Sequence, residues 1–248
     1  MSSPAELRTL LATANHILAH EGVVDAFGHI SARHPEDPNR YLLSCSRSPA
    51  LVSADDIMEF DLASNVVGAD TRSPYLERFI HGAIYEARPD VHAVVHSHAH
   101  ELIPFGVTGT PIRPLIHVAG AIGAEVPIWD IAERFGDTSL LVTNAAVGRD
   151  LAATLGRSTA ALMRGHGAVV TGSSVRNAVL TAIYLNVNAS LDLQSRALGK
   201  VKYLSTREIE KTVAALLGDA PAARAWEYFE KRSSQSPGRP AERGLTVT

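Results

Sequence analysis

Residues 94–101 read VVHSHAHE and place three histidines at alternating positions directly after an apolar run. Alternating side chains of a β-strand share one face, so His96 and His98 are expected to project together from a buried strand. Two imidazoles at that spacing can bind one divalent ion. His100 falls at or just past the strand end, where a hydrogen-bonding or substrate role fits as well as metal ligation.

A catalytic metal site uses about three protein ligands and keeps one position open, so a further ligand is expected elsewhere in the chain. The stretch MRGHGAVV, residues 163–170, offers His166 between two glycines in an otherwise apolar run. Glycines let the backbone come close to a neighbouring group. Taken alone, His166 fits a hydrogen-bonded core histidine. Together with His96 and His98, it favours a metal site.

The stretch SPYLERFIHGAIYEARPD, residues 73–90, has apolar residues at spacings of three and four. This pattern predicts a helix from about Pro74 to Arg88. Glu77 and His81 lie four residues apart, on one face of that helix. A carboxylate near a metal can be a fourth ligand or a general acid/base. The alternative for Glu77 is a solvent-exposed glutamate at a helix start.

Strands and helices alternate through the rest of the chain, which favours one α/β domain with a sheet covered on both sides. The expected elements are a helix that ends before Gly22, short strands within 26–35, 40–46 and 56–62, a strand at 139–143, a helix at 147–156, one or two strands within 160–172, a helix at 174–198, and helices at about 206–217 and 221–232. The domain is expected to span residues 1–232. Residues 233–248 are rich in Pro, Gly and Ser and predict a flexible tail.

Composition indicates an ordinary soluble globular protein. The chain has 248 residues, 46% hydrophobic, and a net charge of −3 from 23 basic and 26 acidic residues. The basic residues form no run, which argues against a nucleic-acid partner. No uncharged apolar run reaches the roughly 18 residues of a membrane span. The single cysteine and the amphipathic start of the chain favour a cytoplasmic location.

Several motifs together resemble the class II aldolase/adducin family. They are a glutamate in a helix that ends ARPD, then AVVHSH, then a distant GHG before a long helix. The resemblance covers about residues 5–215 and implies a three-layer α/β/α fold around a mixed central sheet. It also implies a homotetramer with active sites at subunit interfaces, and one divalent metal ion in each subunit.

Carried over residue by residue, the resemblance matches His96, His98 and His166 to the metal ligands of the family. It matches Glu77 to the catalytic acid/base. Zinc, manganese, iron and cobalt all accept three imidazole ligands, so the sequence leaves the choice among these ions open.

The sequence departs from the sugar-phosphate members of the family at three places. FGHIS, residues 27–31, has His29 where those members have Asn; Arg47 enters the turn SRSP; and Tyr75-Leu76 replaces two serines before the glutamate. A phosphate cradle needs exposed N–H and O–H groups, and Leu76 supplies neither.

A carboxylated aromatic substrate fits these replacements better. Tyr75 can stack against a ring, and Arg47, beside Ser46, can hold a carboxylate through two parallel hydrogen bonds. A surface salt bridge is the alternative role for Arg47. The motifs resemble a subgroup of the family that decarboxylates hydroxylated aromatic dicarboxylates such as 3,4-dihydroxyphthalate. His117 and Tyr203 are further candidates for substrate contacts, with a core histidine as the alternative for His117.

The predicted function is therefore a metal-dependent carbon–carbon lyase, with decarboxylation favoured over aldol cleavage. Glu77 is expected to move the proton that replaces carbon dioxide, and His29 to bond the phenolic oxygen or share that transfer. The alternatives are an aldolase acting on a hydroxy acid, a keto acid or a sugar phosphate, and a non-catalytic, adducin-like binding protein.

Overall fold

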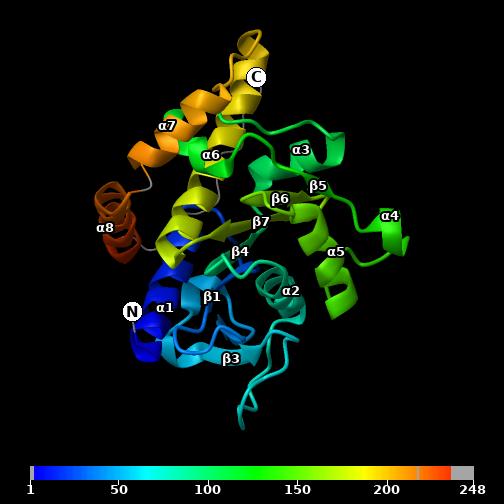
Figure 1. The fold of residues 1–248 in the computed structure, drawn as a ribbon, viewed down its shortest axis with the longest axis vertical. Coiled ribbons are helices and arrows are strands. Elements are labelled where there is room, and N and C mark those ends of the chain that lie inside the picture. Colours follow the sequence, from blue (N-terminus) through cyan, green and yellow to red (C-terminus); the bar gives the residue numbers. More distant parts are fainter. Residues whose placement is uncertain (1–2, 217, 236–248) are drawn as a thin grey trace, which may run out of the picture.

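The computed structural model of the chain describes residues 3–216 and 218–235. Figure 1 shows the course of the chain through its helices and strands. The helices are α1 (Pro4–His20), α2 (Phe79–Ala87), α3 (Ile103–Thr108), α4 (Ala132–Phe135), α5 (Ala145–Leu155), α6 (Val175–Leu198), α7 (Thr206–Leu216) and α8 (Asp219–Gln235). The strands are β1 (His29–Arg33), β2 (Arg40–Ser44), β3 (Ile57–Asp61), β4 (Ala93–Ser97), β5 (Ile128–Trp129), β6 (Ala160–Met163) and β7 (Gly167–Gly172). Short 3-10 helices are η1 (Pro49–Leu51), η2 (Ala54–Asp56), η3 (Leu76–Arg78), η4 (His100–Leu102) and η5 (His117–Ile122).

The strands form one seven-stranded sheet in the order β3-β2-β1-β4-β7-β6-β5. Neighbouring strands are antiparallel except for β5 and β6, which are parallel. The sheet is therefore mixed, as the family resemblance implies. In its middle, β4 lies between β1 and β7, so residues at the end of β4 have neighbours from both.

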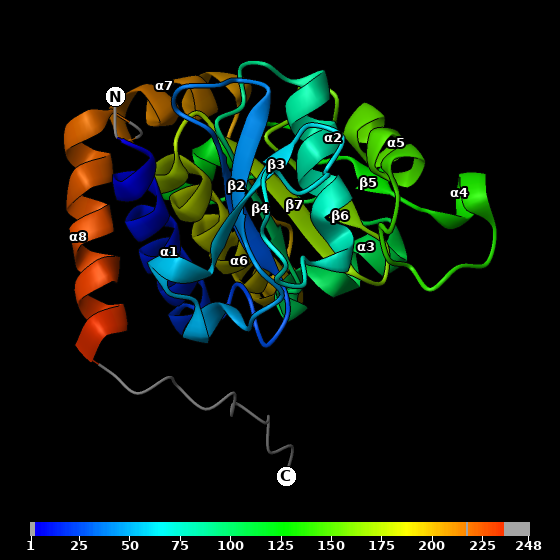
Figure 2. The same ribbon diagram turned by 90° about the horizontal axis from the view of Figure 1, so that it is seen from below.

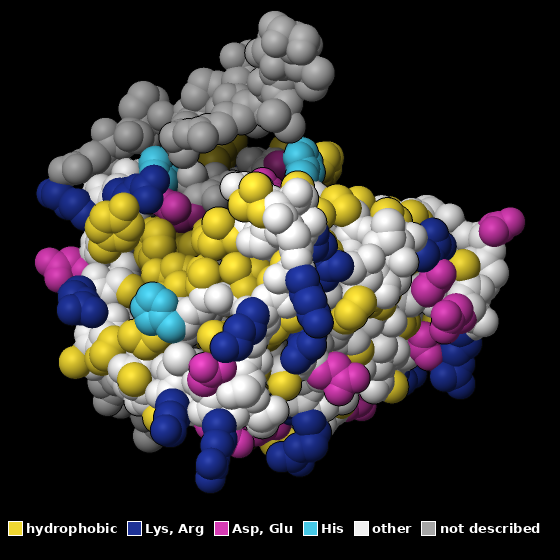
Figure 3. All heavy atoms as spheres, turned by 90° about the horizontal axis from the view of Figure 1, so that it is seen from above, with side chains coloured by type: hydrophobic (Ala, Val, Ile, Leu, Met, Phe, Trp, Pro, Cys, Tyr) yellow, Lys and Arg dark blue, Asp and Glu magenta, His cyan; other side chains and the backbone are white. Residues whose placement is uncertain are grey.

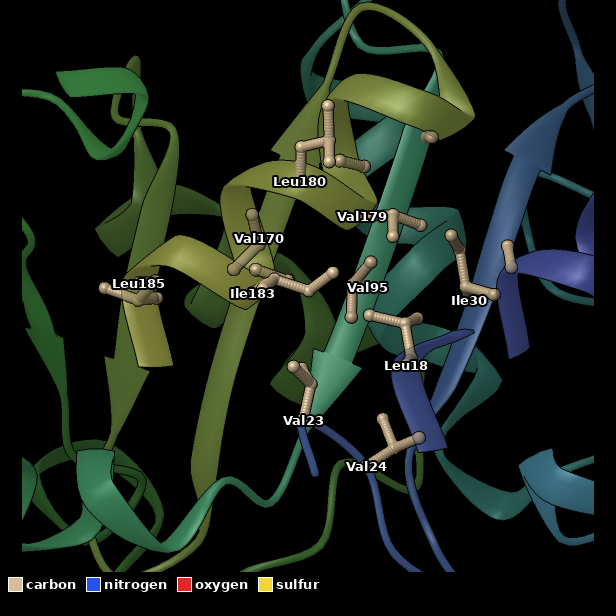
Figure 4. Packing of buried hydrophobic residues seen from close by; sticks show 14 of the residues in the cluster. Leu18, Val23, Val24, Ile30, Val95, Val170, Val179, Leu180, Ile183 and Leu185 are labelled. Carbon is tan, nitrogen blue, oxygen red and sulfur yellow. The ribbon is translucent and has the colours of Figure 1, made fainter. Parts of the chain in front are cut away.

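Alternating residues of the strands face two separate helical layers. Val95 packs in a cluster with α1 and α6, whereas Val94 packs in the cluster formed with α2 and α5. Figure 2 shows α1 and α6 on one side of the sheet and α2 and α5 on the other, and Figure 4 shows the packing of the first cluster. The predicted three-layer α/β/α architecture is confirmed.

The opening helix follows from its sequence. Ser3 and Glu6 form a reciprocal capping box at its start, and Pro4 occupies the first turn, where the missing N–H of proline costs no hydrogen bond. Its apolar side chains at spacings of three and four are buried. Gly22 has φ of +69° just after the helix, a conformation that glycine adopts at little cost.

The strand predicted at residues 139–143 is wrong. This stretch is an irregular loop before α5, although Val142 in it is completely buried. Leu140 has a φ of +65°, which β-strands do not contain. Of its five residues only Val142 is buried, and backbone groups of the loop bond to side chains of the site described below instead of to a neighbouring strand. The two-residue strand β5, which the sequence did not predict, pairs with β6.

The helix predicted from about Pro74 starts later than expected. The α-helical part, α2, begins at Phe79 and follows the 3-10 turn η3. Within that turn, Glu77 has φ −89° and ψ 17°, outside the helical range. Glu77 therefore lies outside α2, and the prediction that it shares one helix face with His81 is wrong.

The C-terminal helices lie close to their predicted positions. α6 has its N-cap at Ser174 and ends before Gly199. Residues 233–235 of the predicted tail are the last residues of α8, and the remainder of that tail lies outside the described residues.

Figure 3 views the molecule from above, and shows hydrophobic side chains gathered in a hollow, with basic and acidic side chains interspersed elsewhere on this face. Within residues 3–216 and 218–235, no helix combines the length and the apolar character needed to span a membrane.

Candidate metal centre

The sheet brings the three predicted ligands together from two neighbouring strands. His96 is on β4, His98 follows the end of β4, and His166 directly precedes β7. Because β4 and β7 are antiparallel and pair Ser97 with Ala168, the end of one strand meets the start of the other. Ligands 70 residues apart in the sequence therefore become neighbours in the fold.

The Nε2 atoms of the three histidines converge on one point. The Nε2 atom of His98 lies 3.1 Å from that of His96 and 3.1 Å from that of His166. Two nitrogens at this separation subtend about 95° at an ion that lies about 2.1 Å from each, which is an ordinary length for a bond from imidazole to a divalent metal. This spacing fits three nitrogens that bind one ion from the same side, which leaves the opposite side of the ion open.

Backbone carbonyls hold two of these rings in the orientation that ligation needs. His96 Nδ1 lies 3.2 Å from Ala168 O, and His166 Nδ1 lies 3.0 Å from Leu140 O. A carbonyl only accepts, so each Nδ1 carries the proton and each Nε2 presents its lone pair. Lone pairs that meet repel one another unless a proton or a cation lies between them. The donor set therefore fits a divalent metal.

His98 completes the set from a less enclosed position. Burial, together with the nearby His96 and His166, lowers its pKa to about 4. The ring is thus neutral near pH 7 and able to donate a lone pair to a metal. The carboxylate of Asp25, which is exposed, lies 3.7 Å from His98 Nδ1.

Glu77 points its carboxylate at the same centre. Its Oε2 atom lies 3.5 Å from the Nε2 atoms of both His96 and His166, and its Oε1 accepts the Val142 N–H at 2.9 Å. Ligand atoms of Glu77, His96, His98 and His166 all lie within 4.8 Å of one another. This placement matches the two roles expected for a carboxylate near a metal, a fourth ligand or an acid/base.

The Glu77 carboxylate is ionised in this setting. Its side chain is 10% exposed, and burial alone would raise its pKa. The neighbouring His166 and His96 rings outweigh burial and hold the pKa of this carboxyl well below its usual range, because each ring is a positively charged partner for it when protonated. In the absence of substrate, Glu77 is therefore a base.

His29 and Tyr75 lie beside the centre. His29 pairs with His96 across β1 and β4, so their side chains share a face, with ring centroids 5.1 Å apart. The Tyr75 ring also lies against His29, with centroids 4.4 Å apart. These aromatic rings form one wall next to the histidine cluster.

Arg47 and Ser46 are exposed on the loop that precedes η1. The Arg47 guanidinium donates to Leu51 O at 2.7 Å and lies 3.4 Å from Asp56 Oδ1. The Tyr75 hydroxyl donates to the Arg47 carbonyl oxygen, and Ser46 N donates to Ser73 O at 2.8 Å. The two segments that the sequence connects with substrate, 46–49 and 73–76, are thus joined to each other.

The other two predicted contacts lie with the C-terminal helices. Tyr203 donates its hydroxyl to Asp192 of α6, and the Arg113 guanidinium lies 4.9 Å from its ring centroid. His117 is exposed at the start of η5. In the described part of the chain, the contacts of Tyr203 are with these neighbours and with Arg196, and not with the histidine cluster.

Comparison with known proteins then identifies the family. A family model described as the class II aldolase and adducin N-terminal domain matches residues 9–193. This chain belongs to the class II aldolase and adducin family. The resemblance found in the sequence is confirmed.

Among class II aldolase relatives, the decarboxylase tropJ of Talaromyces stipitatus is 34% identical over 236 residues, which cover 89% of this chain and 84% of the relative. A 3,4-dihydroxyphthalate decarboxylase of Arthrobacter keyseri is 31% identical over 245 residues, which cover 93% and 95%. The structure of an L-fuculose 1-phosphate aldolase from Glaciozyma antarctica PI12 has a TM-score of 0.73 at 23% identity, covers 93% of this chain and 89% of its own, and shows the shared fold. Decarboxylases and aldolases both cleave carbon–carbon bonds, so these likenesses support a lyase.

Sequence reasoning missed a buried network behind the class II aldolase site. His81, Ser31 and Tyr85 connect to His29 through hydrogen bonds. Two local signals were present: His29 and Ser31 alternate on one strand, and His81 and Tyr85 lie four apart on one helix. Only the packing of α2 on β1 brings these two pairs together.

Proposed function

We propose that the chain is a divalent-metal-dependent decarboxylase of a hydroxylated aromatic carboxylate. One observation carries this proposal: His96, His98 and His166 converge beside a buried, ionised Glu77 in a chain with decarboxylases among its relatives. A non-catalytic, adducin-like role would not need this set of ligands and base.

His96, His98 and His166 would hold one zinc, manganese, iron or cobalt ion. A divalent ion bound there would act as a Lewis acid that stabilises the negative charge left when a carbon–carbon bond breaks. The protein's part is to fix the three Nε2 atoms in advance, which the carbonyls of Ala168 and Leu140 support for two of the rings.

A carboxylated ring is the proposed substrate class. The wall of His29 and Tyr75 offers aromatic surface, and Leu76, next to it, is 65% exposed and apolar. A planar ring gains contact on such surfaces, whereas a phosphate needs N–H and O–H donors. The name of the Arthrobacter keyseri relative indicates a hydroxylated ring with two carboxylates.

Arg47 is proposed to bind a carboxylate of that substrate. Its guanidinium is 49% exposed and lies 3.4 Å from Asp56, so it is available at the surface. An exposed ion pair of this kind contributes about 0–1 kcal/mol. A substrate carboxylate that binds through two parallel hydrogen bonds can compete with it.

Glu77 is proposed to move the proton. As the carboxylate it removes the proton of the phenolic hydroxyl, and it then delivers that proton to the ring carbon that bears the carboxylate. The bond to the carboxylate breaks, carbon dioxide leaves, and the electron pair of that bond restores the aromatic ring. The phenolate is protonated by solvent on release, so one proton is taken up for each carbon dioxide formed.

Aldol cleavage is the alternative reaction, because it uses the same ligands and a base at the position of Glu77. Incubating the metal-loaded protein with 3,4-dihydroxyphthalate, and separately with L-fuculose 1-phosphate, tests the two. We expect carbon dioxide from the first and no aldehyde from the second, with chelator-treated protein as the control. Aldehyde release without carbon dioxide would refute the proposal.

We also propose a homotetramer with active sites at subunit interfaces, as the family resemblance implies. In such an assembly, His117 or Tyr203 of one subunit would contact substrate in the next. Light scattering on the purified protein measures the mass and tests this assembly.

A further inference from the structure

A continuous chain of hydrogen bonds runs from the metal centre into the core. His29 Nδ1 lies 2.7 Å from His81 Nε2, His81 Nδ1 lies 2.6 Å from Ser31 Oγ, and Ser31 Oγ lies 2.8 Å from the Tyr85 hydroxyl. Their side chains are between 0% and 3% exposed. The lengths are short and the groups are shielded from water, so each hydrogen has a defined position.

This chain of hydrogen bonds has one end at the reaction site and the other end in the core. His29 pairs with His96 across the sheet, and its Nδ1 is occupied by His81, so Nε2 is the remaining polar atom of the ring. At the other end, the guanidinium of the buried Arg33 lies 4.8 Å from the Tyr85 ring centroid.

The two hydroxyl groups fix the direction of the chain. Among the described residues, Ser31 Oγ is the acceptor for the Tyr85 hydroxyl. Burial raises the pKa of Tyr85, whereas the Val94 backbone group beside it acts to lower that pKa and is therefore an N–H donor; Tyr85 thus donates to Ser31. Ser31 then donates its own hydrogen to His81 Nδ1. The reverse direction would leave the Tyr85 hydrogen buried without an acceptor, which native structures avoid.

The same logic continues through the two rings. Burial lowers the pKa of His81 to about 3, so this ring is neutral and carries one N–H. Its Nδ1 accepts from Ser31, so the hydrogen is on Nε2 and is donated to His29 Nδ1. Because His29 Nδ1 accepts, the hydrogen of the His29 ring is on Nε2.

We propose that Tyr85, Ser31 and His81 lock His29 as a hydrogen-bond donor whose Nε2–H is directed to an anionic oxygen of the substrate. His29 is thereby assigned to stabilising charge and not to removing a proton, which is left to Glu77. The inference rests on the proposed function for the identity of that oxygen, a phenolate or a carboxylate. Ser31 and His81 are positioning residues, since they act through His29.

A donor fixed in this way is useful where negative charge develops. It needs no reorientation during the reaction, and removing one such donor commonly lowers kcat by about a hundredfold or more. Removing only a positioning residue should cost less, because His29 remains and part of the population keeps the productive form.

The first test reads the hydrogen positions directly and does not depend on turnover. Long-range 1H–15N correlation spectra of the 15N-labelled, zinc-loaded protein distinguish a protonated imidazole nitrogen from a bare one. The His29 signals are assigned by their loss in His29→Gln. We expect His29 protonated at Nε2 and bare at Nδ1, and a proton on His29 Nδ1 would overturn the inference.

Two variants test the direction of the chain. In Tyr85→Phe, Ser31 still donates to His81, so His29 should keep its hydrogen on Nε2. In Ser31→Ala, the constraint on His81 is lost, and the spectrum should show both forms of His29. If the hydrogen bonds instead were donated from His29 toward Tyr85, Tyr85→Phe would be the variant that moves the His29 hydrogen. Zinc content and thermal unfolding show which variants are folded. If Tyr85→Phe or Ser31→Ala fails to fold, the activities of His29→Leu and His29→Gln provide a second comparison.

Kinetics complete the test. Ser31→Ala should lower kcat by about tenfold with little change in KM, as expected for an interaction realised in the transition state. His29→Gln, which keeps a donor but cannot carry a proton, should be more active than His29→Leu. Equal loss in both would contradict the donor role. Carbon dioxide release with a proton on His29 Nδ1 would refute this inference alone, whereas the expected spectra without carbon dioxide release would refute the proposed function alone.

Discussion

Gly167 lies against the backbone of Ser97 so closely that a Cβ atom at position 167 would be 1.9 Å from the Ser97 carbonyl oxygen. Gly167 opens β7 and Ser97 closes β4. Their contact sets the distance between His166 and the two histidines at the end of β4. The glycine after His166 is therefore part of the candidate metal centre, although it supplies no ligand.

Replacing Gly167 by alanine should weaken metal binding and lower the melting temperature. The new methyl group cannot fit, so the two strands must separate at the point where the ligands meet. Gly106→Ala is the matched control, because a Cβ atom there would be 3.6 Å from its nearest neighbour, an ordinary contact. Metal titration and thermal unfolding of both variants provide the measurement. Equal behaviour of the two would show that the close contact does not matter.

His96→Ala should remove the bound metal, because His96 is fully buried and its Nε2 faces the other ligands. Elemental analysis of the purified protein measures the metal content. The control is His92→Ala, an exposed histidine four residues earlier in the same segment, which should retain the metal. Retention of stoichiometric metal by His96→Ala would mean that His96 is not a ligand.

Glu77→Gln should keep the metal and lose most turnover. The amide oxygen can still accept the Val142 N–H that Glu77 Oε1 accepts, but the amide cannot carry a proton. Loss of an acid/base group typically lowers kcat by about 10²–10⁴-fold. Glu36→Gln, at an exposed position, is the control. Loss of metal together with activity would instead make Glu77 a ligand.

Arg47→Ala should raise KM for a carboxylated aromatic substrate and change kcat less. Loss of a charged partner for a carboxylate typically costs about 1.5–3 kcal/mol of binding, or roughly tenfold to a hundredfold in KM. Arg134→Ala is the control, because Arg134 also forms an exposed pair, with Asp150. A KM unchanged in Arg47→Ala would leave Arg47 with its surface pair to Asp56 only.

The metal-free protein should lose stability as the pH falls below 6.5. Burial lowers the pKa of His81 from its ordinary value of 6.5 to about 3. Between these values the unfolded chain binds a proton that the folded chain does not. The free energy of unfolding therefore falls on acidification, by up to about 1.4 kcal/mol per pH unit from this group.

Urea unfolding at pH 7, 6 and 5 measures this slope. His81→Gln should have a shallower slope than the wild type, and His92→Ala, with its ring in solvent, should follow the wild type. Parallel slopes for His81→Gln and the wild type would show that His81 does not titrate in this way.

The sequence predicts the convergence of His96, His98 and His166 because the signals for it are local. The alternating spacing of His96 and His98 predicts that they project together, although His98 lies just past the end of β4. The glycines around His166 indicate a close approach of the backbone. The buried hydrogen-bond network from His29 to Tyr85 was not predictable, because it depends on which face of α2 packs on β1. The spacings of His29 and Ser31 on β1, and of His81 and Tyr85 on α2, do not indicate that these two pairs are in contact.

For the stretch SLLVT, residues 139–143, the sequence predicts an element that the structure does not have. Its apolar pattern is typical of a buried strand, and Val142 is indeed buried. However, Leu140 O accepts a hydrogen bond from His166, and Val142 N donates one to Glu77. These side-chain partners, and not a neighbouring strand, determine the backbone conformation of the segment. Local patterns report burial, but they do not report which partner satisfies a backbone group.

The link between the loop of Arg47 and the segment of Tyr75 has a consequence for changing the enzyme. Hydrogen bonds join these two segments to each other, and Cys45 and Pro74 form an antiparallel β-bridge beside them. The three proposed metal ligands come instead from the end of β4 and the turn before β7. Residues 46–49 and 73–76 can therefore be exchanged as one cassette from a relative with another substrate. Under the proposed function, natural selection, or a directed-evolution library confined to this cassette, would redirect substrate choice while the three proposed metal ligands stay as they are.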